Sequence, residues 1–233
     1  TYEPKPSDIK ALSDTRALFL VGGGLEMFAP DMVKATEKTF PVIEVNSGIE
    51  IINGFNNGAS SDPGNTAGNP HIWLSLRNAQ IIVRNIANAL SQIDPAGSTK
   101  YRENAELYIQ KLEDLDAWFR KESEKIAVKD FVTQHAAWVY FARDYGFVQK
   151  GVIADTPGKE PSPKEIRKLV DTIKNLGISV IFAEPQLNQK AAETLAQETG
   201  MKVAILDPLG RYPDQPYLEL MKTNMQIIIQ YMK

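Results

Sequence analysis

Residues 95–125 read PAGSTKYRENAELYIQKLEDLDAWFRKESEK, and this stretch decides how the chain is organised. From Ser98 to Tyr145 the sequence contains no glycine and no proline. Apolar residues recur there at steps of three and four, which is typical of one face of a helix: Tyr101, Ala105, Tyr108, Leu112, Leu115 and Phe119. Asp94-Pro95 supplies an N-terminal cap and a first-turn proline. The pattern predicts one helix from Pro95 to about Lys125, roughly 45 Å long at about 1.5 Å per residue.

A helix of this length can span two domains. We therefore expect an N-terminal lobe in residues 1–94, a connecting helix in residues 95–127 and a C-terminal lobe in residues 128–233. The alternative is a long helix packed on one larger domain.

On both sides of this helix, short β-rich runs alternate with helical patterns, which favours an α/β fold with parallel sheets flanked by helices. The expected strands are 17–21, 42–45, 130–133, 147–153, 178–182 and 202–206. The other expected helices are 7–12, 25–38, 74–92, 137–145, 163–175, 189–199 and 215–231. Ser162-Pro163-Lys164-Glu165 is a capping box that marks one helix start.

Composition excludes several classes of function. The 233 residues carry a net charge of −3 and no basic cluster, so we expect no nucleic-acid partner. No apolar run approaches the roughly 18 residues that cross a bilayer. Without cysteine there is no disulfide, thiolate metal site or cysteine nucleophile.

The two histidines are the strongest candidates for a site, because the chain contains no others. His71 directly precedes a predicted helix, and His135 follows the strand DFVT, at the carboxyl end where α/β sheets collect ligands. Asp207 and Glu184 hold similar positions after later strands. Asp207 is a candidate ligand, and Glu184 is an alternative ligand, a partner of a histidine or the polar end of a buried strand.

Two imidazoles and a carboxylate suit a first-row divalent ion such as Zn²⁺ and leave one coordination position open. In a zinc hydrolase that position holds an activated water, with Glu184 as general base. In a carrier it holds a fourth protein ligand and the ion is the cargo. No HExxH motif supports the hydrolase.

Two further segments attract attention. Residues 53–69 read NGFNNGASSDPGNTAGN, a long polar loop that is either a binding loop next to His71 or a surface insertion. Gly22-Gly23-Gly24 matches no phosphate-binding motif and predicts a sharp turn.

The whole chain resembles the solute-binding receptors of ABC importers for zinc and manganese. The resemblance rests on Tyr2-Glu3-Pro4 with Pro6-Ser7-Asp8-Ile9, Gly24-Leu25-Glu26, Asn69-Pro70-His71-Ile72-Trp73-Leu74, Gln134-His135 with Tyr140-Phe141 and Tyr145-Gly146, Glu160-Pro161-Ser162-Pro163, Glu184-Pro185 and Leu206-Asp207-Pro208-Leu209.

This resemblance implies a metal ion bound between two lobes by His71 from the first and by His135 and Asp207 from the second. The family's remaining ligand is a histidine whose place would directly precede Thr1, and its first strand and helix are also missing, so we expect a shortened form of a longer chain. Imidazole ligands favour Zn²⁺, with Mn²⁺ as the alternative.

The implied function is that of a receptor without catalytic activity. It would be a monomer, periplasmic or lipid-anchored outside the cytoplasmic membrane, that delivers the ion to a membrane permease. A surface adhesin is a further alternative, since relatives have been described that way.

Overall fold

The computed structural model describes residues 3–52, 68–154, 161–176, 178, 180–211 and 214–232. Most of the 53–69 loop therefore lies outside the described residues. No helix in these ranges is both long and apolar enough to cross a membrane.

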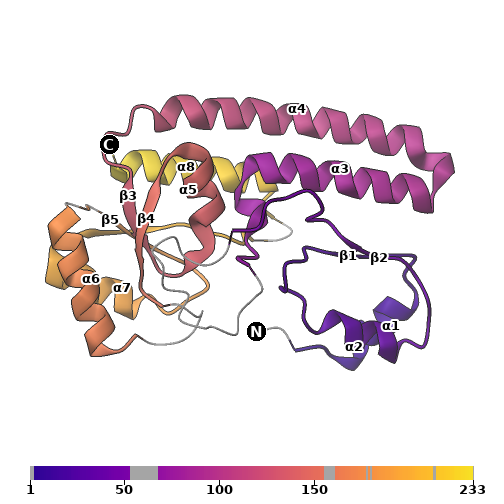
Figure 1. Ribbon diagram of the computed structural model, residues 1–233, viewed down its shortest axis with the longest axis horizontal. Coiled ribbons are helices and arrows are strands. Elements are labelled where there is room, and N and C mark those ends of the chain that lie inside the picture. The colour runs from indigo at the N-terminus through magenta and orange to yellow at the C-terminus, as the bar shows by residue number, and fades with distance from the viewer. Residues whose placement is uncertain are drawn as a thin grey trace.

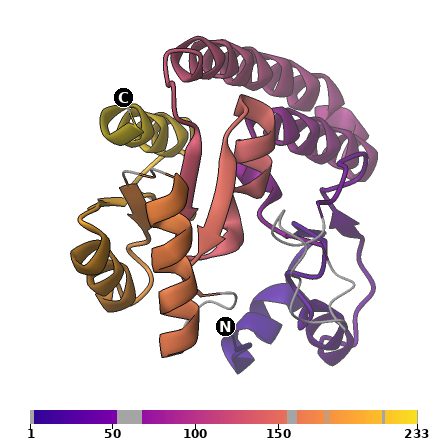
Figure 2. The ribbon, with the colours of Figure 1, turned by 60° about the vertical axis from the view of Figure 1, so that its left-hand side comes forward.

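Two parallel sheets, one in each half of the chain, confirm the predicted α/β class. The first pairs β1 (Leu18–Leu20) with β2 (Val42–Glu44), and it lies with α1 (Pro6–Ser13), α2 (Ala29–Ala35) and α3 (Leu76–Ile93) in the N-terminal half. The second has the order β4-β3-β5-β6 and comes from the C-terminal half. Its strands are β3 (Asp130–Thr133), β4 (Val148–Val152), β5 (Val180–Ala183) and β6 (Lys202–Ile205). Figure 2 shows the two halves facing each other.

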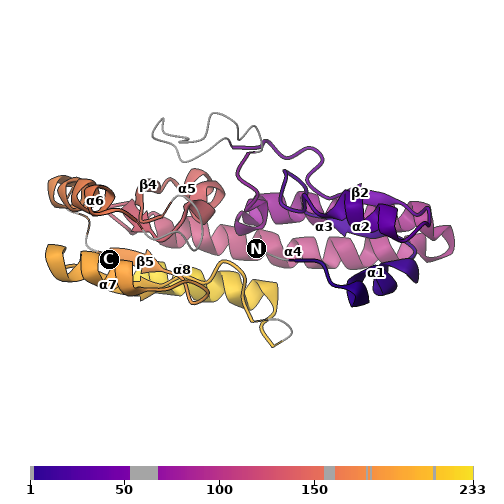
Figure 3. The ribbon, with the colours of Figure 1, turned by 90° about the horizontal axis from the view of Figure 1, so that it is seen from below.

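The long helix predicted at the outset is α4 (Ser98–Ser123), preceded by a 3-10 turn at Pro95–Gly97. It runs along most of the length of the molecule, beside α3 over one half and near α5 (Val139–Tyr145) and α8 (Tyr217–Met232) over the other, while α6 (Pro163–Leu176) and α7 (Lys190–Thr199) extend beyond its end (Figures 1 and 3). Asp94 is the N-cap residue of the 3-10 turn and Pro95 lies in its first turn, as predicted, but the Asp94 side chain makes no capping hydrogen bond. Its carboxylate instead accepts a hydrogen bond from the Tyr101 hydroxyl at 2.6 Å. The lobe boundaries themselves stay a prediction.

Helix α2 is shorter than predicted at both ends. Residues 23–28 form turns, since Gly22, Gly23 and Gly24 all have positive φ angles. The Glu26 carboxylate accepts hydrogen bonds from the amides of Val21 and Gly22 and fastens this turn, so the sharp turn predicted for the three glycines is confirmed. At the other end Glu37, with a φ of 54°, lies just beyond the helix.

Helices cover both faces of the four-stranded sheet. One core cluster includes Phe119 of α4, Phe141 of α5, Phe182 of β5 and Met225 of α8. The other packs α6 and α7 against the opposite face. The predicted capping box at the start of α6 is confirmed by reciprocal hydrogen bonds between Ser162 and Glu165. With both faces covered, all four residues of β5 are buried, and the polar groups that serve a site gather at the strand ends.

Candidate metal site

His135, Glu184 and Asp207 follow the neighbouring strands β3, β5 and β6, at the carboxyl edge of the sheet. His135 is 7% exposed and Glu184 is 2% exposed. His135 Nδ1 is hydrogen-bonded to Glu184 Oε1, and the backbone amide of Glu184 donates to Gln134 Oε1 at 2.9 Å. The sheet therefore fixes the orientation of the His135 ring through the carboxylate beside it.

His71 reaches the same place from the N-terminal half of the chain. It lies between Asn69-Pro70 and a 3-10 turn at Ile72–Leu74 that leads into α3. Its Nε2 atom lies 3.1 Å from Nε2 of His135, with ring centroids 4.9 Å apart and ring planes at 61°. The structure thus brings together the two histidines, which are 64 positions apart in the sequence.

The protonation of the His71 ring follows from its hydrogen bonds. Asn69 Oδ1 accepts from the backbone amide of His71 at 3.0 Å, so this atom is an acceptor. The same oxygen lies 2.9 Å from His71 Nδ1, which must therefore carry a hydrogen. Nε2 of the neutral ring then carries a lone pair that points toward His135.

The carboxylate of Glu184 accepts a hydrogen bond from Nδ1 of His135, so the hydrogen of this ring is also on Nδ1 and its Nε2 carries a lone pair. Two Nε2 lone pairs at 3.1 Å repel each other unless a cation lies between them, either a proton on His135 or a metal ion. Two nitrogens bound to one tetrahedral Zn²⁺ lie about 3.3 Å apart at Zn–N distances near 2.05 Å. The observed separation is thus close to that of a metal-bound pair.

The surroundings of His71 also disfavour its protonation. Burial, and then the neighbouring His135, lower the pKa of His71 to about 3. The ring is therefore neutral at physiological pH, which is the form that coordinates metals.

Asp207 lies at the same edge but is engaged in its own loop. Its Oδ1 atom accepts hydrogen bonds from Gln186 Nε2 at 2.6 Å and from the backbone amides of Leu209 at 3.0 Å and Gly210 at 2.8 Å. Within the part of the chain that the structure describes, no three His, Asp or Glu side chains are grouped so as to hold a metal ion. Asp207 as third ligand therefore stays a prediction.

Two residues of the site were not assigned roles from the sequence. Asn69 contacts His71 as described, and the Tyr140 hydroxyl donates to the Asn69 carbonyl at 2.6 Å. A signal was available for Asn69, because Asn side chains often bond to the backbone two residues further on. Tyr140 gave no comparable signal, since an aromatic residue on an apolar helix face is usually part of the core.

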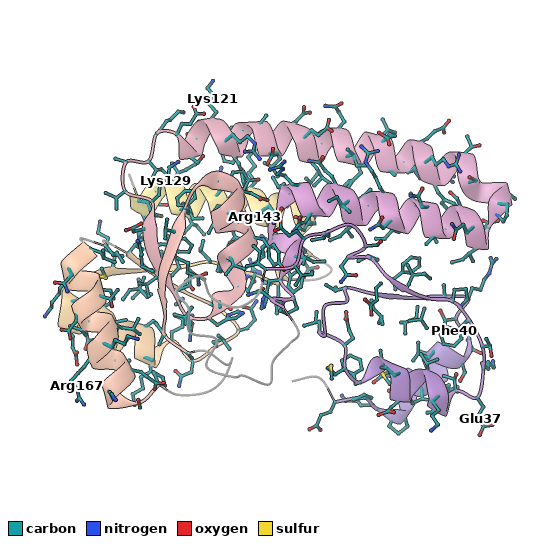
Figure 4. The ribbon with its side chains drawn as sticks, in the orientation of Figure 1. Glu37, Phe40, Lys121, Lys129, Arg143 and Arg167 are labelled. Carbon is teal, nitrogen blue, oxygen red and sulfur yellow. The ribbon has the colours of Figure 1, made fainter. Side chains whose placement is uncertain are left out.

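Hydrogen bonds also join the two halves of the chain around the site. The Trp73 indole donates to the carbonyl of Pro208 at 2.8 Å, and the Tyr217 hydroxyl donates to the Trp73 carbonyl at 2.6 Å. Farther along, Asp144 accepts hydrogen bonds from Ser75 Oγ and, at 2.8 Å, from Arg143 Nε. Figure 4 shows Arg143 where α5 meets the start of α3.

A family model described as "Zinc-uptake complex component A periplasmic" matches residues 1–231. The zinc-binding protein AdcA of Streptococcus pyogenes serotype M6 is 32% identical over 248 aligned residues, which cover 97% of this chain and 48% of AdcA. The chain thus spans about half the length of this relative.

Solved structures resemble the whole chain. A Zn(II)-bound mutant variant of AdcAII of Streptococcus pneumoniae is 30% identical, with a TM-score of 0.89 over 100% of this chain and 86% of that one. A Mn-bound mutant of the periplasmic metal-binding protein of Candidatus Liberibacter asiaticus is 27% identical, with a TM-score of 0.87, and the match covers 100% of this chain and 87% of that one. A mutant of the laminin-binding adhesin Lmb of Streptococcus agalactiae is 30% identical, with a TM-score of 0.88. The match covers 100% of this chain and 86% of that one.

Proposed function

The chain belongs to the ZnuA family of periplasmic zinc-uptake complex components, and from this premise we propose that it captures a divalent metal ion between His71 and His135 and delivers it to the permease of an ABC importer. The observation that carries this proposal is the 3.1 Å approach of two Nε2 atoms whose Nδ1 atoms are both hydrogen-bonded to oxygen. Such a pair is prepared to bind a cation without first changing tautomer.

Asp207 is the proposed third ligand. It follows β6, which pairs with β5, the strand that ends just before Glu184. The hydrogen bond from Trp73 to Pro208, the residue after Asp207, holds the His71 segment close to Asp207. Its Oδ1 atom serves the loop, and Oδ2 accepts no hydrogen bond from the described residues. Coordination through Oδ2 therefore leaves the loop bonds intact.

Zn²⁺ is the preferred ion, because borderline-soft imidazole nitrogens favour it over Mn²⁺. Two relatives support this order, since AdcA is named a zinc-binding protein and the AdcAII variant is Zn(II)-bound. The Mn-bound neighbour keeps Mn²⁺ as the alternative cargo.

Transport is favoured over hydrolysis by the position of Glu184. A general base must be free to take a proton from a metal-bound water. Glu184 Oε1 is instead hydrogen-bonded to His135 Nδ1 and buried with it. We therefore propose that this carboxylate orients a metal ligand and that the protein is a receptor without catalytic activity.

We propose that the receptor acts as a monomer outside the cytoplasmic membrane, either periplasmic or lipid-anchored. Adhesion is a second candidate function, favoured by the likeness to the laminin-binding adhesin Lmb. In that case loss of a metal ligand would leave laminin binding unchanged.

The test is equilibrium binding of Zn²⁺ and Mn²⁺ to metal-free protein at neutral pH against a competing chelator. We expect one Zn²⁺ per chain, weaker Mn²⁺ binding and an affinity for Zn²⁺ that falls more than about 100-fold in His135→Ala, because a ligand is lost. Asp207→Asn should also weaken binding. Asp171→Asn, which changes an exposed carboxylate of α6, is the matched control and should bind as the unchanged protein does.

Binding indifferent to His135→Ala would overturn the proposed site. Binding that is weakened by His135→Ala but not by Asp207→Asn would remove Asp207 from the ligand set.

A further inference from the structure

The side-chain amide of Asn69 contacts both histidine segments at once. Its Oδ1 atom accepts from the His71 amide at 3.0 Å and lies 2.9 Å from His71 Nδ1. Its Nδ2 atom donates to the carbonyl of Ala136, the residue directly after His135. One short side chain therefore connects the two halves of the chain beside the proposed metal position.

The orientation of this amide is determined at both ends. A backbone N–H only donates, so the atom facing the His71 amide is the oxygen. A backbone carbonyl only accepts, so the atom facing Ala136 is the nitrogen. An exchange of the two atoms would break both hydrogen bonds, and the oxygen is thereby held against His71 Nδ1.

The backbone of Asn69 is held as firmly as its side chain. Its carbonyl accepts from the Tyr140 hydroxyl at 2.6 Å, and its amide donates to the carbonyl of Ile52 at 2.8 Å. The amide of Ile52 in turn donates to the Tyr140 hydroxyl at 3.2 Å. Tyr140 is fully buried in a cluster with Ile49, Ile72 and Val139, which contains residues of both halves.

We infer that Asn69 is a positioning residue for metal capture: it holds His71 in the tautomer with a free Nε2 and fixes its distance from His135. The inference rests on the proposed function, which supplies the reason for an accessible Nε2. Without Asn69 Oδ1, the His71 ring has no acceptor for its Nδ1 hydrogen, and the hydrogen moves to Nε2, where it can bond to Nε2 of His135. That tautomer has no lone pair directed at the metal position.

Two substitutions separate the two contacts of the amide. Asn69→Ala removes both, so His71 should change tautomer and Zn²⁺ affinity should fall about 10- to 100-fold, as for other groups that orient a metal-binding histidine. Asn69→Asp keeps the acceptor for Nδ1 but has no donor for Ala136. It should preserve the His71 tautomer while the affinity for Zn²⁺ falls, since the donor to Ala136 is replaced by a carboxylate oxygen that repels the Ala136 carbonyl.

A matched control is Asn78→Ala. Asn78 is a buried asparagine of α3 whose Nδ2 atom donates to the carbonyl of Ile72 at 3.1 Å and to neither imidazole. Its loss should lower thermal stability without altering the tautomer of His71. A purely structural role of Asn69 predicts the same pattern for Asn69→Ala.

The experiment is NMR of the imidazole nitrogens in protein labelled with ¹⁵N-histidine, metal-free and at one neutral pH, combined with Zn²⁺ binding against a chelator. The chain has only two histidines, so four ring nitrogens need assignment. We expect hydrogen on His71 Nδ1 in the unchanged protein, Asn69→Asp and Asn78→Ala, and on Nε2 in Asn69→Ala. An unchanged tautomer in folded Asn69→Ala, or Zn²⁺ affinity within twofold of the unchanged protein, would overturn the inference.

The two readouts distinguish this inference from the proposed function. If the unchanged protein binds no Zn²⁺ but Asn69→Ala still changes the His71 tautomer, the role of Asn69 in fixing the ring stands and the receptor proposal fails. If Zn²⁺ binds tightly to both proteins, the receptor proposal stands and the role of Asn69 fails.

Discussion

At the scale of single residues, the site is a continuous series of hydrogen bonds in which each group limits the next. Asn69 fixes His71, and Glu184 fixes His135. The two rings then meet at their Nε2 atoms, and among the described residues each Nε2 has only the other as a polar partner. Such an arrangement favours a bound cation and costs free energy when His71 itself must take up a proton.

This cost predicts how stability depends on pH in the metal-free protein. The pKa of His71 is about 3 in the folded state and about 6.5 in an unfolded chain, so the unfolded state binds more protons between these values. Stability contributed by His71 is therefore fully present above about pH 6.5 and is lost as the pH falls toward 3, by at most about 1.4 kcal/mol per pH unit.

Urea denaturation at several pH values, in the presence of a chelator, measures this loss. As the pH falls from 7 to 4, the free energy of unfolding of the unchanged protein should decrease more than that of His71→Gln. Carboxylates titrate in both proteins and cancel in the comparison. If the free energy of unfolding depended on pH in the same way in both proteins, burial would not disfavour the His71 imidazolium.

At the scale of elements, α4 is stabilised by the face that it buries. Leu112 is fully buried against the core that also contains Phe119 and α5, whereas Leu107 on the same helix is 67% exposed. Leu112→Ala should lower the free energy of unfolding by about 2–5 kcal/mol, because it removes apolar contacts and leaves a cavity.

Leu107→Ala is the matched control, with the same change in the same helix. It should alter stability by no more than about 0.5 kcal/mol, since its side chain already contacts water. Chemical denaturation of both variants checks the prediction, and similar losses in the two would contradict the packing of α4 described above.

At the scale of the whole molecule, α4 and the bonds beside the site limit how far the two halves can move. The helix has no glycine or proline from Ser98 to Ser123 and contacts elements of both halves. Trp73, Pro208 and Tyr217 already connect the halves without a metal ion. We therefore expect adjustment of loops and side chains on metal binding rather than wide hinge closure.

Small-angle X-ray scattering tests this expectation. The radius of gyration of the metal-free and Zn²⁺-loaded protein should differ by less than about 1 Å, whereas hinge closure contracts a two-lobed protein more strongly. His135→Ala with added Zn²⁺ controls for nonspecific effects of the ion. A contraction of several ångströms in the unchanged protein alone would mean that α4 or its contacts bend.

The elements and their order could be predicted from the sequence, because they depend on local patterns. The steps of three and four in 101–119 predict α4, and buried strands followed by polar residues predict the sheet edge that carries His135, Glu184 and Asp207. The start of α2 was misread, because the positive φ angles of Gly22, Gly23 and Gly24 form a turn and the helix begins only at Ala29.

Local sequence patterns were enough to predict the α/β class, the long helix and the position of two histidines near the ends of elements. Long-range packing sets the 3.1 Å distance between His71 and His135, the bond from His135 to Glu184, and the contacts by which Asn69 and Tyr140 join the halves beside them. These contacts join residues 49 to 71 positions apart, so they depend on how the chain folds back on itself and leave no local pattern in the sequence.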